Sequence, residues 1–215
     1  MKEKLATDKG APDSARPRVH RDGNVLRRAL EPGHGKERGE PYGRPILVVL
    51  SGLPGTGKTH FARELTRRVP FIVLESDRVR KLLVARPKYT PGEHSRVFEV
   101  CHLLLEEYLA AGRRVLFDAT NLTESFRRPL YSISDRLSVP LCLVRFTAPW
   151  ETIRRRLAER AAGMDPDNYS DAGWLIYCRL LPHEEPIRRR HFSVDSSEDI
   201  CTVLEDVARL SCAER

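Results

Sequence analysis

Gly52-Leu53-Pro54-Gly55-Thr56-Gly57-Lys58-Thr59 directly follows the apolar run 46–51 (Ile-Leu-Val-Val-Leu-Ser). Its spacing, G-x-x-x-x-G-K-T, is typical of a loop between a strand and a helix whose backbone N–H groups surround a phosphate. In such a loop Lys58 reaches the β- and γ-phosphates, and the Thr59 hydroxyl is available to Mg²⁺. The positive end of the following helix dipole acts on the same anion. The segment therefore predicts a nucleoside triphosphate site.

Other glycine-rich loops fit the sequence less well. The dinucleotide pattern G-x-G-x-x-G is absent, as is the guanine-reading N-K-x-D, so we expect ATP with Mg²⁺. An accidental glycine turn is the remaining alternative. The residues expected to bind the nucleotide are Gly52, Pro54, Gly55, Thr56, Gly57, Lys58, Thr59 and His60.

The overall composition indicates one catalytic domain. The chain has 215 residues, a formal charge of +7 and five cysteines at wide spacing without a C-x-x-C pair. This cysteine usage favours a reduced, cytoplasmic setting over a disulfide framework or a zinc site. No apolar run is long enough for a membrane span. The basic balance gives weak support to an anionic partner such as nucleic acid.

Residues 1–44 hold much of this charge, with 11 Lys and Arg against 7 Asp and Glu. They contain few sizeable aliphatic side chains, so we predict a disordered basic N-terminal extension followed by a kinase domain over 45–215. Such an arm could bind nucleic acid or remain an inert solvated tail.

From residue 46 onward, short apolar runs alternate with helical patterns. This alternation predicts an α/β fold of three layers, a P-loop NTPase of the kinase type, with a five-stranded parallel sheet flanked by helices and a helical lid. Ligands of such sheets bind beyond the carboxyl ends of the strands. The expected strands are 46–51, 71–74, 115–118, 141–146 and 191–194. The expected helices are 59–68, one from about 75, 90–112, 123–137, one from about 149, 171–185 and 197–210.

Two aspartates end predicted strands at this edge. Asp77 follows the second strand, where a carboxylate could take the proton of an acceptor hydroxyl, although it could simply cap a helix. Arg80 shares its helix face and could hold an anionic group of the acceptor or form a surface salt bridge. Asp118 occupies the position of a metal-holding aspartate after a buried strand and could hold Mg²⁺ through water or orient an acceptor, although it could also cap a turn. Thr120 and Asn121 extend the same polar edge and are expected to bind the acceptor with Asp118. No Glu follows Asp118, which favours transfer to a substrate over transfer to water.

An arginine cluster lies between residues 154 and 160, next to the breakable segment 162–170. We expect a mobile lid around 150–170 that carries an arginine to the transferring phosphoryl group. Arg156 and Arg160 lie four residues apart on one helix face, whereas Arg154 and Arg155 are expected to face solvent. A wholly solvated basic helix is the alternative.

Four segments together resemble a known family: GLPGTGKTHFAREL, SDRVRKLL, VLFDATNLTESFRR and APWETIRRRLAER. They are similar to the P-loop kinases that include phage-type polynucleotide 5′-hydroxyl kinases, zeta-toxin-like kinases and small-molecule kinases. The resemblance covers residues 46 to about 163. It implies transfer of the γ-phosphate of ATP to a hydroxyl. The sequence also departs from the family pattern, because no phosphatase domain follows and residues 165–185 have no clear counterpart.

By this resemblance, Lys58 and Thr59 would bind the triphosphate and Mg²⁺, and Asp77 would act as the general base. Arg80 would contact the acceptor phosphate, and Asp118 would line the acceptor site. Arg160 would be the lid arginine, with Arg156 the second choice.

Three functions are consistent with these features. The first is a kinase whose leading acceptor is a polynucleotide 5′-hydroxyl. The second is a small-molecule kinase acting on a sugar, a sugar acid or an antibiotic. The third is an ATP-dependent switch that binds the nucleotide without transferring phosphate.

Overall fold

The computed structural model describes residues 16–30, 44–163, 170 and 172–213, and its elements are named here in chain order. The helices are α1 (Arg16–Leu30), α2 (Lys58–Arg68), α3 (Ser76–Leu83), α4 (Pro91–Ala110), α5 (Glu124–Leu137), α6 (Trp150–Ala161), α7 (Trp174–Leu180) with the short 3₁₀ helix η1 (Leu181–His183), and α8 (Cys201–Cys212). The strands are β1 (Leu47–Ser51), β2 (Ile72–Glu75), β3 (Val115–Asp118), β4 (Leu141–Thr147) and β5 (Phe192–Asp195).

The five strands form one parallel sheet in the order β2-β3-β1-β4-β5. β1 lies at the centre and is buried along its whole length, as expected for a strand covered on both faces. In the register, Asp118 at the end of β3 faces Leu50 of β1 on one side and Glu75 of β2 on the other. The sheet confirms the predicted fold class and brings the carboxyl ends of β1, β2 and β3 together.

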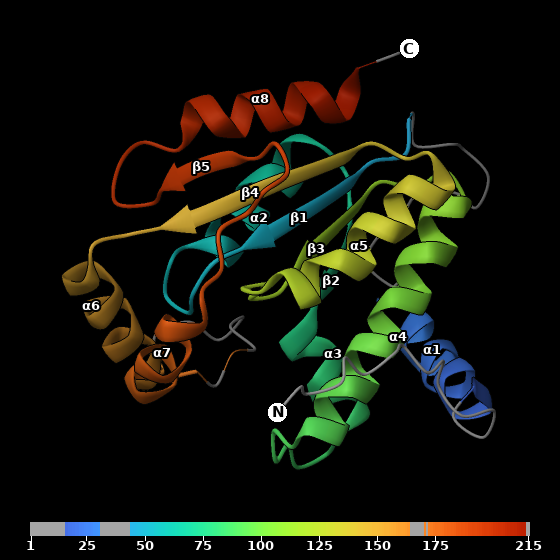
Figure 1. Ribbon diagram of the computed structural model, residues 1–215, viewed down its shortest axis with the longest axis horizontal. Coiled ribbons are helices and arrows are strands. Elements are labelled where there is room, and N and C mark those ends of the chain that lie inside the picture. The colour runs from blue at the N-terminus through green and yellow to red at the C-terminus, as the bar shows by residue number, and fades with distance from the viewer. Residues whose placement is uncertain (1–15, 31–43, 164–169, 171, 214–215) are drawn as a thin grey trace, which may run out of the picture.

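Helices cover both faces of the sheet, giving three layers (Figure 1). Alternate residues of β1 belong to two separate core clusters, because successive side chains of a strand point to opposite faces. Leu47 and Val49 pack with the apolar faces of α1, α4 and α5. Val48 and Leu50 pack with α2 and α8. The three layers follow from this alternation, because each face of the sheet is apolar and is covered by helices.

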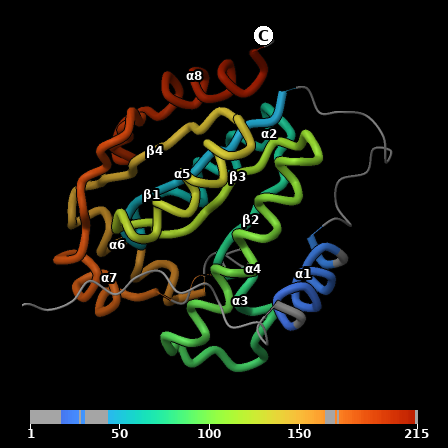
Figure 2. Tube along the Cα trace, turned by 45° about the vertical axis from the view of Figure 1, so that its right-hand side comes forward, coloured from blue at the N-terminus to red at the C-terminus, as the bar shows by residue number. Residues whose placement is uncertain are grey.

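Helix α1 corrects the prediction for the N-terminal extension. Residues 16–30 are helical and lie against α3 and α4 (Figure 2). Leu26 is 0% exposed within the core cluster, and Asp22 accepts two hydrogen bonds from Arg96 of α4 at 2.7 and 2.8 Å. The prediction of disorder is wrong for this helix because its apolar stripe and its ion pairs find partners on α4. The rest of 1–44, apart from Arg44, lies outside the described residues.

Two predicted helices are shorter than expected. The predicted helix 171–185 contracts to α7 and η1, with Pro182 in the tighter 3₁₀ turn. The predicted helix 197–210 begins only at Cys201, because Asp195 and Asp199 hold turns by accepting from the backbone N–H groups of Ser197 and Cys201. None of the described helices combines the length and the apolar character that a membrane crossing requires.

Candidate functional site

The loop after β1 has a backbone that only glycine can supply. Gly55 and Gly57 have φ angles of 82° and 87°, in the left-handed region. A Cβ at Gly57 would lie 2.9 Å from the Cβ of Ser196, and one at Gly52 would lie 2.7 Å from the carbonyl oxygen of Phe146. The loop is thus packed against the end of β4 and the segment that follows β5, and α2 begins directly after it at Lys58.

Lys58 lies inside this loop. Its Nζ donates hydrogen bonds to the carbonyl oxygens of Gly52 and Leu53, both at 2.9 Å. Burial lowers the pKa of Lys58, and the carboxylates of Asp118 and Asp77 oppose that shift. The Lys58 amine is therefore held by two carbonyl oxygens of the loop, and the charges of Asp118 and Asp77 act on it, which is the electrostatic setting that a triphosphate would enter.

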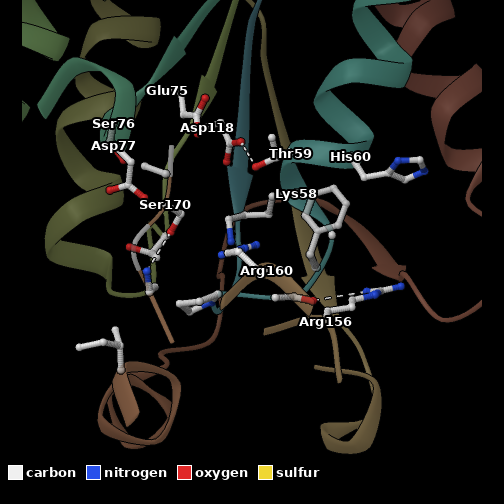
Figure 3. A pocket seen from close by; sticks show the side chains of 18 of the residues that line it. Lys58, Thr59, His60, Glu75, Ser76, Asp77, Asp118, Arg156, Arg160 and Ser170 are labelled. Carbon is white, nitrogen blue, oxygen red and sulfur yellow. Dashed lines mark hydrogen bonds between the residues drawn. The ribbon is translucent and has the colours of Figure 1, made fainter. Parts of the chain in front are cut away.

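Thr59 and Asp118 form the second part of the site. The Thr59 hydroxyl donates to Asp118 Oδ2 at 2.9 Å, which links the first turn of α2 to the end of β3 (Figure 3). Burial raises the pKa of Asp118, while the charge of Lys58 and the hydrogen bond from Thr59 act in the opposite direction. A hydroxyl and a carboxylate oxygen side by side are ligands that Mg²⁺ prefers.

Asp77 stands opposite this pair on the first turn of α3 and lines the same cavity. Sequence reasoning missed its neighbour Glu75, the last residue of β2, which also lines the cavity. Burial, followed by the charges of Asp118 and Asp77, raises the pKa of Glu75 to about 8. The sequence held one usable signal for it, since an acidic residue ended an otherwise apolar strand.

The two lid arginines are positioned differently. Arg160 lines the cavity with its guanidinium beside Lys58 (Figure 3). Arg156 donates to the hydroxyl and the carbonyl oxygen of Ser196, both at 2.7 Å, and to Gly55 O at 3.4 Å. Both arginines therefore face the loop side of α6, as their spacing predicts, whereas Arg154 and Arg155 are exposed. Of the segment predicted as mobile, 164–169 lies outside the described residues.

The structure separates the remaining predicted residues into two groups. Arg80 and Thr120 line the cavity, and the Arg80 guanidinium donates to Glu93 Oε1 at 2.7 Å and lies over the Tyr89 ring. His60 also borders the cavity, but its exposed ring points away from Lys58 (Figure 3). Asn121 is different, since its side chain is 0% exposed and donates to Leu50 O at 2.8 Å. The expectation that Asn121 binds acceptor is therefore wrong.

The loop residues Gly52 and Thr56 have a structural role. Thr56 is buried and its hydroxyl donates to Leu53 O at 2.7 Å, so it braces the loop. Neither Thr56 nor Gly52 is among the residues that border the cavity, whereas Pro54, Gly55 and Gly57 are.

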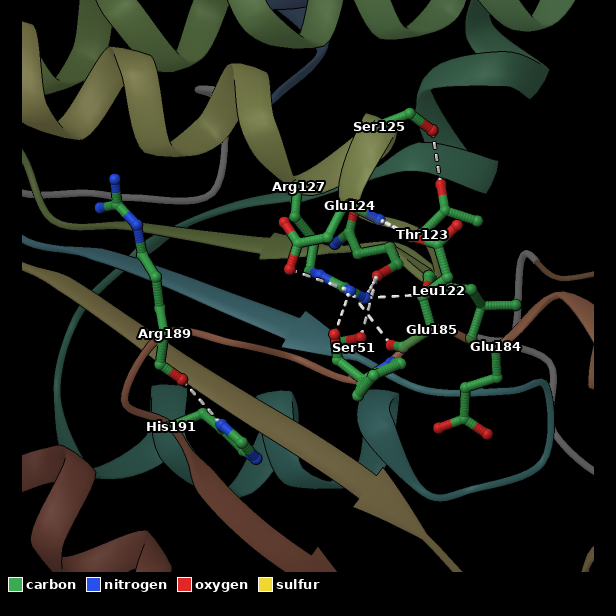
Figure 4. Close-up of polar contacts among 12 residues, drawn as sticks. Ser51, Leu122, Thr123, Glu124, Ser125, Arg127, Glu184, Glu185, Arg189 and His191 are labelled. Carbon is green, nitrogen blue, oxygen red and sulfur yellow. Dashed lines mark hydrogen bonds and ion pairs between the residues drawn. The ribbon is translucent and has the colours of Figure 1, made fainter.

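Arg127 is a structural residue that the sequence did not reveal. It is 0% exposed, and its guanidinium donates to four carbonyl oxygens (Figure 4). These carbonyls belong to Asn121, Leu122, Glu185 and Pro186. Arg127 thereby ties the loop after β3 to the segment after η1.

The cavity between these walls has a volume of about 880 Å³. On the β1–α2 side it is bordered by the glycine loop, Lys58 and Thr59, and on the α3–α4 side by Asp77 and Arg80. Three aromatic residues that the prediction did not include complete the second wall: Tyr89, His94 and Phe98. The space is large enough for a nucleotide and a second molecule together.

Comparisons with known proteins agree with this architecture. A family model described as "AAA domain" (AAA_33) matches residues 47–174. The L-seryl-tRNA(Sec) kinase of Methanococcus maripaludis is 25% identical over 120 residues, which are 54% of this chain and 46% of that protein. The chain thus spans about half the length of this curated relative.

Solved structures share the fold at low sequence identity. The Chaetomium thermophilum Kti12 in complex with ADP-AlF3 has a TM-score of 0.60 at 18% identity, covering 78% of this chain and 100% of that one. The Mycobacterium tuberculosis APS kinase CysC in complex with AMPPNP and APS has a TM-score of 0.56 at 17% identity, covering 78% and 98%. A gluconokinase from Sinorhizobium meliloti has a TM-score of 0.54 at 17% identity, covering 79% and 93%.

The fold is thus that of P-loop kinases. Since the family match extends over more than half of its residues, the chain belongs to the AAA_33 (AAA domain) family.

Proposed function

We propose that this protein is an ATP-dependent kinase that transfers the γ-phosphate of ATP to a hydroxyl group. One observation carries the proposal: Lys58 with the Thr59–Asp118 pair, and Asp77 on α3, border one cavity from opposite walls. A phosphoryl group held at Lys58 would therefore have a carboxylate on the side from which an acceptor approaches. In-line transfer requires this arrangement.

Each residue has a separable role in this proposal. The glycine loop and Lys58 bind the β- and γ-phosphates. Asp77 accepts the proton of the attacking hydroxyl, and Arg160 neutralises charge that develops on the phosphoryl oxygens. Ala119, and not a glutamate, follows Asp118, so the residue that often activates water beside this aspartate is missing from that position.

The residues present also fit Mg²⁺. The Thr59 hydroxyl and Asp118 Oδ2 lie 2.9 Å apart at the phosphate end of the cavity and would hold the ion. When bound, the ion would offset charge on the β- and γ-phosphate oxygens. Apart from binding the ion, Thr59 and Asp118 keep the start of α2 fixed to the end of β3.

For the acceptor, we favour a hydroxyl carried by a nucleic acid, with a polynucleotide 5′-hydroxyl as the first choice. Arg80 borders the acceptor side of the cavity, Arg179 of α7 borders the same cavity, and the chain carries a formal charge of +7. The relative named as an L-seryl-tRNA(Sec) kinase supports an RNA-borne hydroxyl as a variant of the same idea.

A small-molecule acceptor is the second candidate. Arg80 is ion-paired with Glu93 at 2.7 Å, with both side chains almost fully buried, so part of its charge is already compensated. The aromatic wall of Tyr89, His94 and Phe98 would suit a compact ligand with an apolar ring. This candidate needs no extended contact outside the cavity.

A screen with ATP labelled in the γ-phosphate tests the proposal. Wild type is incubated with 5′-hydroxyl oligonucleotides, tRNA, sugars and sugar acids, and label is followed into each acceptor. Asp77→Asn is expected to keep nucleotide binding and to lower the transfer rate about 100-fold or more, the usual scale for loss of a positioned base. Asp206→Asn on α8 is the matched control and should transfer at the wild-type rate.

Two outcomes contradict the proposal. Nucleotide binding without label in any acceptor would favour an ATP-dependent switch. Undiminished transfer by Asp77→Asn would remove this aspartate from its role as base.

A further inference from the structure

We propose that α3 and the turn leading to α4 form a docking surface for single-stranded nucleic acid at the mouth of the cavity. The inference rests on the proposed function, because it names the acceptor class for the same site. We define the docking surface as the exposed parts of residues 78–89.

The charge of this segment is of one sign. Between Arg78 and Gly92 the sequence contains five Lys and Arg residues and no Asp or Glu. Within it, Lys81, Arg86 and Lys88 are exposed. The first acid that follows, Glu93, accepts a hydrogen bond from buried Arg80 and so lies beneath the surface. Arg86 and Lys88 thus present positive charge in a stretch of sequence without acidic residues, and phosphates would complement them.

Helix α1 extends the same charge. Asp22 pairs with Arg96 and Arg27 pairs with Glu107, so α1 runs along α4 in the same direction. The first turns of α1 therefore lie toward the N-terminal end of α4, the end that follows the turn carrying Tyr89. Arg18 and Arg21 on these turns are exposed. Two further exposed cations thus lie on α1, toward the same end of α4.

Tyr89 connects this surface to the cavity. Its side chain is 50% exposed, yet it also borders the cavity. Its φ angle of 55° is in the left-handed region, which a bulky residue rarely adopts. The Arg80 guanidinium lies 4.8 Å from its ring centroid and supports one face. A ring presented in this way at the edge of a cationic surface is a platform for base stacking.

The proposed ligand is a flexible single strand of nucleic acid. Its end would enter the cavity toward Asp77, one base would stack on Tyr89, and the following phosphates would lie on Lys81, Arg86 and Lys88. Stacking on Tyr89 requires an unpaired base, so a fully paired duplex end would not make this contact.

The test measures binding of a fluorescent 5′-hydroxyl oligonucleotide by anisotropy at several salt concentrations. Arg86→Glu combined with Lys88→Glu should weaken binding about 10-fold or more and reduce the salt slope, by roughly 1.4 for two lost phosphate contacts on a single strand. Arg67→Glu combined with Arg209→Glu makes the same charge change on exposed positions of α2 and α8, and should leave binding within about 2-fold.

Tyr89 is tested by separate variants. Tyr89→Ala should weaken binding about 10-fold with little change in the salt slope, because a stacked base is lost and no phosphate contact is. Tyr89→Phe should retain binding. A loss caused only by misfolding would also alter the thermal midpoint, which is measured for each variant.

The outcomes separate this inference from the proposed function. Unchanged affinity in the double charge reversal, or no oligonucleotide binding by wild type, overturns the docking surface. If wild type still transfers label to a small hydroxyl compound, the kinase function stands without the docking surface. If oligonucleotides bind as expected but receive no label, the docking surface stands and the proposed acceptor reaction fails.

Discussion

At the scale of single residues, Glu75 gives a pH dependence whose sign can be worked out. Its pKa is about 8 in the folded chain and near 4.5 when unfolded, so the folded state binds more protons between these values. The free energy of unfolding should therefore fall as pH rises from about 4.5 to 8. Glu75→Gln stays neutral and should be more stable than wild type at pH 8 by about 1–3 kcal/mol.

Urea unfolding at pH 6 and pH 8, without nucleotide or metal, measures this difference. The control is Glu205→Gln, at an exposed position of α8, which should not alter the pH dependence. An equal fall in stability in Glu75→Gln and wild type would show that Glu75 is already ionised in the fold.

Arg127 makes the second prediction for a single residue. Replacing it by Leu removes the guanidinium that donates to two buried carbonyl oxygens, of Asn121 and Leu122, and to two partly buried ones, of Glu185 and Pro186. Arg127→Leu should therefore lower the free energy of unfolding by about 3 kcal/mol. Arg128→Leu changes the exposed neighbour and should stay within about 0.5 kcal/mol. Similar losses in both would show that the network does not carry this stability.

Glu75 and Arg127 also show how far local sequence patterns can predict a site. The glycine loop, Lys58, Thr59, Asp77 and Asp118 could be found from the sequence, because motif spacing and strand ends locate them in any parallel sheet. The partners of Arg127 are up to 59 residues away, and no short pattern marks them. Asn121 was misassigned for the same reason, since its burial depends on contact with β1.

At the scale of elements, α1 shows how tertiary contacts can determine a helix. Few of its residues are apolar, and Gly23 in its middle lowers helix propensity. That glycine permits close packing, because a Cβ there would lie 3.1 Å from Leu103 Cδ2. The sequence of 1–44 alone could not reveal this, since the partner surface is on α4.

The prediction for α1 compares two neighbouring apolar residues. Leu26 is 0% exposed in the core, and Val25 is 52% exposed. Leu26→Ala should lower the free energy of unfolding by about 2–5 kcal/mol, while Val25→Ala should cost less than about 1 kcal/mol. Urea titrations of both variants measure this. A small and equal effect would mean that α1 is not part of the folded core in solution.

At the scale of the whole molecule, the sheet joins a nucleotide-binding side to an acceptor side, and the cavity lies between them. The fold class and the layers were predictable because strand and helix patterns alternate and apolar runs mark β1 to β4. The aromatic acceptor wall was not, although His94 and Phe98 lie four residues apart on α4, because nothing in their spacing shows that this face of α4 and the preceding Tyr89 border the cavity.

This arrangement predicts how the whole chain responds to a nucleotide. A ligand that binds only the folded state stabilises it by RT ln(1 + [L]/Kd), about 2.7 kcal/mol at 100 times Kd. For a chain of this size, that shifts the thermal midpoint by roughly 5–11 °C. A non-hydrolysable ATP analogue with Mg²⁺ should give this shift in wild type and in Arg67→Ala, and lose most of it in Lys58→Ala. Because the shift is measured within each variant, any intrinsic effect of the substitution on stability cancels. An undiminished shift in Lys58→Ala would place the nucleotide outside the glycine loop and remove the basis for the transfer geometry.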